Sequence, residues 1–218
     1  NLLMAGFIKP HHPFDPPAPW HEMYDPDALT LVPGWTENSL PHDTTYSPGY
    51  FPNADMTESQ LRRAMAYYYA TISQIDHHVG RMIDLLKQKG LYDDTLIVYT
   101  SDHGDFLGFH HLLLKGNHMY DPLMRIPLIV KYPGQSHSGE TTAALSSNVD
   151  IAPTLLCRAN CEIPQTMRGL DLEQHPEGRD AVFAEAGSRE YMVRTRTRKL
   201  LLNRDPDASL LFDLEKDP

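Results

Sequence analysis

The sequence of 218 residues predicts an α/β fold that is followed by the start of a small antiparallel subdomain. Short apolar runs at residues 2–8, 95–100 and 126–132 indicate strands, and helical patterns lie between and after them, as in an α/β core. After about residue 180 the chain changes to short β-rich runs joined by turns, which is typical of an antiparallel meander. We therefore expect an α/β domain over residues 1–180 and the beginning of the subdomain over residues 181–218.

The most regular pattern in the chain predicts a long helix that begins after Thr57. Thr57 and Gln60 have the spacing of a capping box, in which each side chain bonds the backbone N–H of the other residue. Apolar residues then recur every three or four positions, as on one face of a helix. The members of this face are Leu61, Met65, Tyr68, Ile72, Ile75, Val79, Met82 and Leu86. Gly90 stands where a left-handed residue ends a helix.

Two further segments have clear local signals. "NVDIAPTLLCRA" has helical spacing, with Asn148 or Asp150 as the N-cap. Between Pro13 and Asn53 the chain is rich in Pro, Asp, His, Gly and Tyr and has no sustained periodicity. Because a loop of this length is usually functional, we expect it to line a pocket together with residues 106–118.

Composition excludes several classes of partner. The formal net charge is −10 and no basic block occurs, which disfavours nucleic acid and anionic membranes. No apolar run approaches the roughly 20 residues that span a bilayer. The opening "NLLMAGFIKP" lacks a basic leader and a cleavage site, and it begins inside an expected strand without an initiator Met. We therefore expect these residues to be part of a longer protein.

The two cysteines, Cys157 and Cys161, form a C-x₃-C pair. Such a pair can bind a metal or form a disulfide, but nothing near it completes a four-ligand zinc set. We favour ordinary packing thiols, since a free cysteine behaves as a small buried hydrophobic residue.

The stretch "TLIVYTSDHGDFLGFHHLLLKG" starts as a strand and ends in a cluster of polar side chains. In open α/β sheets ligands bind beyond the carboxyl ends of strands. Asp102 and His103 can reach one ion there, because the chain turns and Gly104 supplies the freedom for that turn. A carboxylate and an imidazole suit Mg, Mn, Ca, Zn or Fe in differing degrees. The pair makes half of a metal site, and the alternative is a plain polar loop.

Two more residues have the chemistry to handle an anionic ester. Lys115 can act as a point charge on an ester oxygen, although a single lysine is most often a surface residue. His11, which follows the first expected strand, can hydrogen-bond a leaving group or act as a general acid. His111 and its neighbour His110 are either substrate contacts or plain loop residues.

The run from "YYYATISQIDHHVGRMIDLLKQKG" through "LYDDTLIVYTSDHGDFLGFHHLLLKG" to "YDPLMRIPLIVKYPG" resembles the sulfatases of the alkaline phosphatase superfamily. "GFIKPHHPF" is similar to their P-H-x-P-F loop, and "NVDIAPTLL" and "LLFDLEKDP" are similar to their downstream signatures. The resemblance covers nearly the whole chain in one order. It implies a mixed sheet flanked by helices, followed by the start of the small antiparallel subdomain.

The resemblance also implies site residues. Asp102 and His103 would bind one divalent cation, usually Ca²⁺, with Mg²⁺ or Mn²⁺ as alternatives. Lys115 and His11 would contact the sulfate group, and His111 is a further candidate for substrate binding. Relatives often have Asn where His103 stands, and His there is similar to phosphonate monoester hydrolases and to choline- and iduronate-type sulfatases. The ester type and the metal therefore stay open.

The family's C-x-P-x-R motif, whose Cys or Ser becomes formylglycine, and its N-terminal Asp-Asp metal pair do not occur in this sequence. We therefore expect the nucleophile to lie outside the sequence and these residues alone to be inactive. The expected function is hydrolysis of a small-molecule or carbohydrate sulfate ester, with a phosphonate monoester or phosphodiester as the alternative. A non-catalytic module that holds an anion or a sugar is a further alternative. The family implies a periplasmic, secreted or lysosome-like location.

Overall fold

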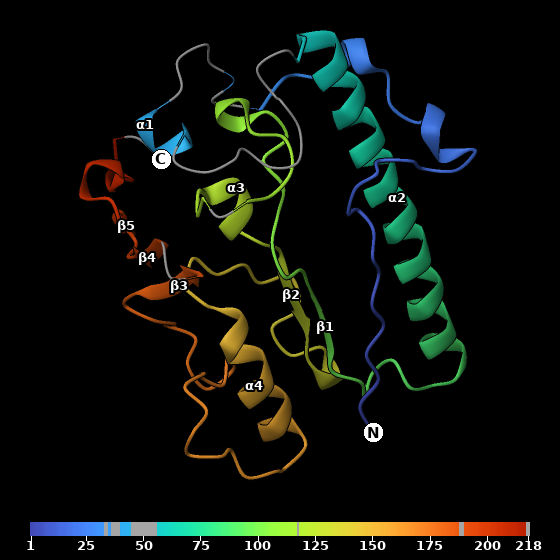
Figure 1. Ribbon diagram of the computed structural model, residues 1–218. Coiled ribbons are helices and arrows are strands. Elements are labelled where there is room, and N and C mark those ends of the chain that lie inside the picture. Colours follow the sequence, from blue (N-terminus) through green and yellow to red (C-terminus); the bar gives the residue numbers. More distant parts are fainter. Residues whose placement is uncertain (33–34, 36–39, 45–55, 117, 188–189, 217–218) are drawn as a thin grey trace. The chain divides into compact units, whose positions relative to one another are not determined.

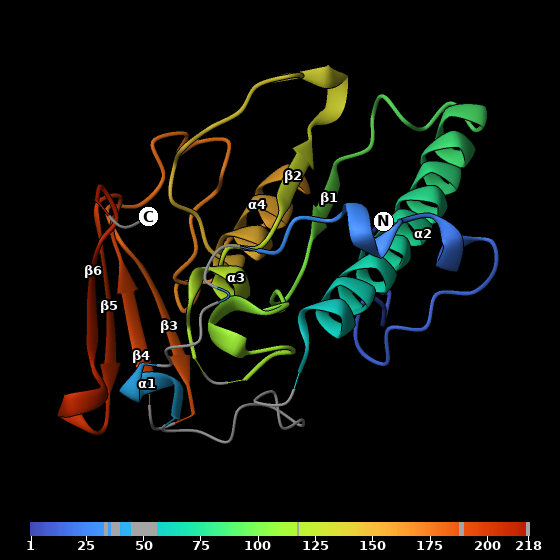
Figure 2. The same ribbon diagram turned by 90° about the horizontal axis from the view of Figure 1, so that it is seen from above.

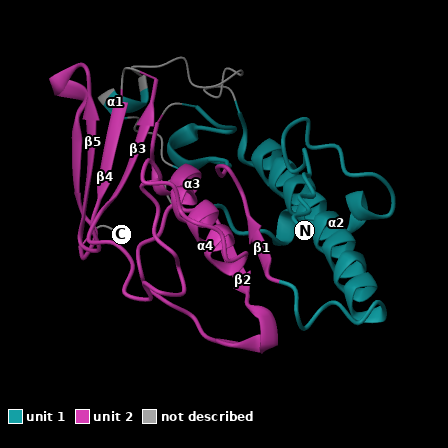
Figure 3. Ribbon diagram, turned by 90° about the horizontal axis from the view of Figure 1, so that it is seen from below, with its two compact units in different colours: residues 1–95, 105–116 teal, residues 96–104, 117–218 magenta. Residues whose placement is uncertain are grey.

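The computed structural model describes residues 1–218 except 33–34, 36–39, 45–55, 117, 188–189 and 217–218. The chain divides into two compact units, which Figure 3 shows in different colours. The first unit contains residues 1–95 and 105–116, and the second contains residues 96–104 and 117–218.

The first unit is built on the long helix α2, Glu58–Gln88 (Figure 1). Thr57 caps the helix as predicted: the Gln60 N–H donates to Thr57 Oγ1 at 3.3 Å, and the Thr57 N–H donates to Gln60 Oε1 at 2.9 Å. Gly90 adopts the left-handed conformation with φ 66°, which confirms the predicted end of the helix. Local signals therefore set both ends of α2.

The predicted apolar face of α2 is buried mainly over its first half. Leu61 and Met65 have 0% exposure and form a core with Leu107. Further along the helix, Ile72 is 38% exposed and Met82 is 40% exposed. The side chains packed against the core come from the loops of this unit and from α2: Phe14, Leu29, Leu31, Val32, Trp35, Met56, Tyr68, Tyr69 and Leu113.

The N-terminal segment departs from prediction. Residues 2–8 form no strand, and Leu2 and Leu3 are 81% and 91% exposed. A strand is held by hydrogen bonds to a neighbouring strand, and no described residue pairs with this segment in that way. The loop that follows is irregular as predicted, with 3-10 helices at Trp20–Glu22 and Pro26–Ala28 and a short helix α1, Pro41–Thr44. Its residues 45–53 lie outside the described ranges.

The second unit begins with an antiparallel pair of strands, β1 (Ile97–Thr100) and β2 (Leu128–Lys131), in which Val98 pairs with Val130. The predicted strands are confirmed with shorter bounds. The resemblance implies a mixed sheet. In the described residues, β1 and β2 are the two strands that correspond to it. The short helix α3 spans Asp121–Met124.

Helix α4, Ile151–Arg158, follows a 3-10 helix at Asn148–Asp150. Asp150 occupies the N-cap position of α4, which confirms one of the two predicted alternatives. The other alternative, Asn148, is wrong. The Asp150 side chain does not cap α4, because it accepts the backbone N–H groups of Ser147 and Leu170, each at 2.8 Å. Asp150 is 1% exposed and is ion-paired with Arg179.

The predicted meander is confirmed as a four-stranded antiparallel sheet in the order β3-β4-β5-β6, which Figure 2 shows as one layer. Its strands are β3 (Val182–Ala186), β4 (Glu190–Arg194), β5 (Arg198–Asn203) and β6 (Leu210–Asp213). All four fall within residues 181–218, and the predicted domain boundary at residue 180 stays a prediction.

Two smaller expectations can be compared with the structure. Cys157 and Cys161 are both free thiols; Cys157 is half-buried and Cys161 is exposed, so the packing role is wrong for Cys161. Among the helices that the structure describes, none has an apolar stretch long enough to cross a bilayer.

Candidate active site

The predicted metal pair lies in the turn that follows β1. The Ser101 hydroxyl donates to the carbonyl of His103 at 2.7 Å, and the His103 N–H donates to Asp102 Oδ1 at 3.0 Å. The amide of Asn148 donates to the carbonyl of Ser101 at 3.3 Å. Asp102 Oδ2 and His103 Nε2 thereby lie 3.7 Å apart.

The donor atoms of this pair fit a cation. His103 Nδ1 lies 2.8 Å from the carbonyl oxygen of Gly104, and a carbonyl only accepts, so the hydrogen is on Nδ1 and Nε2 presents its lone pair. Metal-binding histidines usually fix their tautomer through such a bond. The Asp102 side chain is 87% exposed, so an ion can reach it. Metal–ligand bonds of about 2.1–2.5 Å can join both atoms to one ion.

Gly104 has a different role from the one predicted. Its φ is outside the left-handed region, so the turn does not depend on glycine's conformational freedom. A Cβ atom at this position would instead overlap the carbonyl oxygen of Pro122 in α3. The Gly104 N–H donates to the carbonyl of Leu123 at 2.8 Å. Glycine is therefore required because α3 approaches the backbone closely.

In the first unit, Lys115 follows a tight loop. The N–H groups of residues 106–108 donate to the carbonyls of residues 112–114 at 2.7–2.8 Å, so the two arms lie side by side. Leu107 lies in the core on α2, and Leu112 and Leu114 are buried. This anchoring fixes the backbone from which Lys115 extends.

The same loop holds three non-glycine residues in the left-handed region. Leu107, His110 and His111 have φ values of 48°, 50° and 60°. Each such residue costs of order 1–3 kcal/mol, and strain of this kind gathers at functional sites. The strained residues lie between the metal pair and Lys115 in the sequence, which points to this loop as functional.

Lys115 acts electrostatically on His12, the neighbour of the predicted His11. The rings of His11 and His12 stack with centroids 4.1 Å apart, and His11 Nδ1–H donates to the carbonyl of His12 at 2.7 Å. Burial, followed by the positive charges of His11, Lys115 and Lys9, lowers the pKa of His12. Lys115 is therefore close enough to act electrostatically on this segment, in which Lys9 is paired with Asp15.

Helix α2 supports both the segment that contains His11 and His12 and the loop that precedes Lys115. Phe14, just after the histidine pair, packs edge-on against Tyr68 of α2 with ring centroids 5.3 Å apart. Leu107, in the loop before Lys115, packs on Leu61. The two segments therefore pack on the same helix although they are far apart in the sequence.

The ring of the third predicted substrate contact, His111, is tilted by 32° to the ring of Trp35, and the two centroids lie 3.9 Å apart. His111 Nε2 is buried and has no hydrogen-bond partner among the described residues. His110 differs, because its Nδ1 lies 3.2 Å from a carboxylate oxygen of Asp43. A substrate role for His111 stays a prediction.

The structure thus brings together two groups of predicted residues. Asp102 and His103 are adjacent in the second unit, and Lys115 lies near His11 and His12 in the first unit. The roles assigned to them remain predictions.

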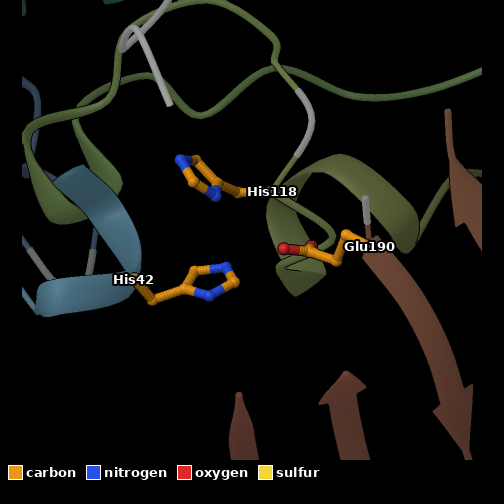
Figure 4. Close-up of side chains that lie close together, drawn as sticks. All are labelled: His42, His118 and Glu190. Carbon is orange, nitrogen blue, oxygen red and sulfur yellow. The ribbon is translucent and has the colours of Figure 1, made fainter. Parts of the chain in front are cut away.

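Sequence reasoning missed His118 and Glu190 of the second unit, which Figure 4 shows. Both side chains are buried, and their potential ligand atoms lie within 4.8 Å of each other. The Glu190 carboxylate accepts the Met119 N–H at 2.8 Å. The signal was the alternation in β4, which puts Glu190 on the buried side with Met192. Figure 4 also draws His42, a buried residue of the first unit that no sequence pattern singled out.

A second missed group is a charge network around Asp121. Its carboxylate accepts from Arg194 at 2.5 Å and from Lys199 Nζ at 2.6 Å. Burial opposes ionisation of Asp121, but the two cations outweigh it and hold its pKa below the usual value. Burial lowers the pKa of Lys199, which is 3% exposed, against the pull of Asp121. The sequence contained one signal of this network: the alternation in β5 puts Lys199 on the buried face with Leu201.

The comparisons with known proteins agree on one family. Residues 1–161 match the family model "Sulfatase", and residues 108–218 match the model "N-sulphoglucosamine sulphohydrolase, C-terminal". The arylsulfatase of Clostridium perfringens is 32% identical, over 100% of this chain and 47% of its own length. The chain thus spans about half the length of that relative.

Two solved structures extend the likeness to the fold. The phosphonate monoester hydrolase of Agrobacterium radiobacter matches with a TM-score of 0.84 and 26% identity, over 97% of this chain and 50% of its own. A protein solved in complex with its substrate, D-glucosamine-2-N,6-O-disulfate, matches with a TM-score of 0.66 and 35% identity, over 74% of this chain and 36% of its own. These matches confirm the predicted α/β fold with its small antiparallel sheet.

Proposed function

The chain belongs to the sulfatase family, and we propose that the protein containing it hydrolyses a sulfate ester. The observation that carries this proposal is that Lys115 acts electrostatically on His12, the neighbour of His11. It places a lysine charge beside two histidines in a chain of net charge −10. An anionic ester needs such a local site, because the protein as a whole repels it.

The family implies a divalent cation, and we assign Asp102 and His103 as two of its ligands. Asp102 would supply a carboxylate oxygen and His103 the lone pair of Nε2, since its Nδ1–H bonds the Gly104 carbonyl. We propose Ca²⁺ first, with Mg²⁺ or Mn²⁺ as alternatives, because hard cations prefer oxygen ligands and an imidazole suits several metals. A cation held there supplies Lewis-acid stabilisation of negative charge on the ester.

Lys115 and His11 would act on the ester itself. Lys115 would place its ammonium on a sulfate oxygen and stabilise the charge that develops there. His11 Nδ1–H already donates to the His12 carbonyl, so His11 donates through Nε2 only when the ring carries both protons. In that form it can give a proton to the leaving oxygen.

The nucleophile is proposed to come from outside this sequence. In the family it is formylglycine, made from the Cys or Ser of a C-x-P-x-R motif, and neither Cys157 nor Cys161 is followed by Pro-x-Arg. A formylglycine there would supply the nucleophile for the sulfur of the ester. The residues described here would then bind, orient and neutralise the sulfate group.

We propose a sulfated carbohydrate as the substrate class. The support is the relative solved with D-glucosamine-2-N,6-O-disulfate, at 35% identity over 74% of this chain. The adjacent rings of Trp35 and His111 offer an aromatic surface and a buried ring nitrogen in the first unit, which also contains Lys115 and His11.

A phosphonate monoester is the second candidate substrate. The observation that favours it is the match to the Agrobacterium radiobacter phosphonate monoester hydrolase, with a TM-score of 0.84 over 97% of this chain. His103 is consistent with either ester.

The test uses the full-length protein, purified with Ca²⁺, and compares its turnover of an aryl sulfate, an aryl phosphonate and glucosamine 6-sulfate. We expect the sulfates to react faster and Asp102→Asn to abolish turnover, while Asp213→Asn on the sheet β3–β6 leaves it unchanged. Faster reaction of the phosphonate would overturn the sulfate proposal in favour of the second candidate. Turnover of none of the three esters would contradict both.

A further inference from the structure

We propose that Asp121 is a positioning residue that holds the metal-binding pair Asp102–His103 in place by locking α3 onto the sheet β3–β6. The inference rests on the metal site of the proposed function. All of its contacts lie within the second unit.

The first step joins the metal pair to α3. Gly104, the residue after His103, donates its N–H to the Leu123 carbonyl at 2.8 Å. The carbonyl of Pro122 occupies the space that a side chain on residue 104 would fill. Because both contacts are made by backbone atoms, a shift of α3 moves the turn that carries Asp102 and His103.

The second step shows that α3 cannot hold this position by itself. It has four residues, Asp121–Met124, and a helix of one turn is unstable in isolation because nucleation is unfavourable. Its position must therefore come from tertiary contacts.

Those contacts come from the sheet, at three consecutive residues. The Met119 N–H donates to the Glu190 carboxylate at 2.8 Å. The Tyr120 ring packs edge-on against Phe212 of β6, with centroids 6.2 Å apart. Asp121 then accepts from Arg194 and Lys199. The segment that leads into α3 is thus fixed to strands β4, β5 and β6.

Asp121 makes the charged part of this attachment. Arg194 and Lys199 are cross-strand partners in the register of β4 and β5, so both donors stand on one rigid pair. Lys199 is 3% exposed, and Asp121 is the carboxylate that its ammonium bonds. Because the Lys199 ammonium is buried, removing the carboxylate that pairs with it leaves an uncompensated charge, which strongly destabilises this arrangement. The loss of Asp121 should therefore release α3 and the turn it supports.

The experiment measures cation affinity rather than activity. Ca²⁺ binding to the full-length protein is followed by titration calorimetry and repeated with Mn²⁺, for the parent, Asp121→Asn and Asp102→Asn. We expect Asp121→Asn to weaken the affinity about 10–100-fold, as is usual for groups that orient metal ligands. Asp213→Asn is the matched control, since it neutralises a carboxylate that bonds Arg198 of β5 at 2.7 Å on the same sheet. It should leave the affinity unchanged.

Two variants of Lys199 separate positioning from a general loss of stability. Lys199→Arg keeps the positive charge, so its Ca²⁺ affinity should stay within about 3-fold of the parent. Lys199→Met removes the charge and should weaken the Ca²⁺ affinity about 10-fold or more. If Asp121→Asn does not fold, the milder Arg194→Met, which leaves the Lys199 bond intact, takes its place. Unchanged affinity in folded Arg194→Met or Asp121→Asn overturns the inference and leaves the proposed function intact. A parent that binds neither cation, or Asp102→Asn that binds as tightly as the parent, overturns the metal assignment and the inference together.

Discussion

Gly104 and Pro122 approach so closely that a single methyl group on Gly104 would overlap the carbonyl oxygen of Pro122. The overlapped atom belongs to the backbone of α3, so it cannot rotate away as a flexible side chain can. Gly104 thus couples the end of β1 to α3, and the sequence "SDHGD" needs its glycine for this contact.

We predict that Gly104→Ala destabilises the full-length protein by about 1–3 kcal/mol, the usual cost of overpacking. Urea unfolding measures the change. Gly80→Ala is the control, because a Cβ at Gly80, inside α2, meets nothing within 4 Å. Alanine in a helix interior should stabilise by up to about 1 kcal/mol relative to glycine. Equal stability of the two variants would contradict the proposed close contact.

The buried ion pair of Asp150 and Arg179 leads to a second prediction. Asp150 also accepts the N–H groups of Ser147 and Leu170, so its carboxylate ties together three segments. Asp150→Asn should cost about 3–5 kcal/mol, the range for breaking a buried pair. The exposed pair of Arg198 and Asp213 provides the comparison, and Asp213→Asn should cost less than about 1 kcal/mol. Chemical denaturation of both variants tests the difference.

The same carboxylate predicts a pH dependence. Burial raises the pKa of Asp150, but Arg179 and the backbone N–H groups of Leu170 and Ser147 outweigh it, and the pKa lies below the usual value. The folded-state pKa is thus below the unfolded value of about 3.9. Its contribution to stability is present above the unfolded pKa and is lost as pH falls through the folded pKa.

Urea unfolding between pH 3 and pH 7 measures this effect. The parent should lose stability below about pH 4, and Asp150→Asn should lose less over the same interval because position 150 no longer titrates. Parallel curves for parent and variant would show that Asp150 does not provide the acid dependence.

Lys115 gives a prediction about activity. Lys115→Ala in the full-length protein should lower kcat/KM for a sulfate ester about 10²–10³-fold, the loss typical of one group that stabilises transition-state charge. Lys115→Arg should recover part of the activity, since the charge remains but the geometry differs. Lys89→Ala, at the exposed end of α2, is the control and should match the parent. An equal fall in kcat/KM in Lys115→Ala and Lys89→Ala would contradict a specific role for Lys115.

Sequence reasoning succeeded where the determining contacts are local. The ends of α2 follow from Thr57, Gln60 and Gly90, which act within a few residues. Asp102 and His103 are adjacent in the chain, so a turn after β1 is enough to bring their donor atoms together.

It failed where pairing between distant segments decides the structure. The apolar run at residues 2–8 has the composition of a strand, but a strand also needs a hydrogen-bonding neighbour, which no local pattern specifies. The bond from Lys199 to Asp121 likewise joins two distant segments. Alternation in β5 showed that the lysine faces inward, but it did not identify the carboxylate that receives it.

The orientation of His11 leads to the last prediction. Its Nδ1–H is bonded to the His12 carbonyl at 2.7 Å, so only the doubly protonated ring offers a hydrogen at Nε2. If His11 gives that proton to the leaving group, its loss should lower kcat/KM. In His11→Asn the side-chain amide can still donate a hydrogen bond but cannot give up a proton. We expect this variant to be slower by about 10²-fold or more, as for the loss of a general acid.

His12→Asn is the matched control for this role, because it removes the neighbouring ring and leaves the ring of His11 in place. We expect His12→Asn to keep most of the parent's kcat/KM. If His12→Asn loses the rate and His11→Asn retains it, the donor is His12, and the assignment of His11 is wrong.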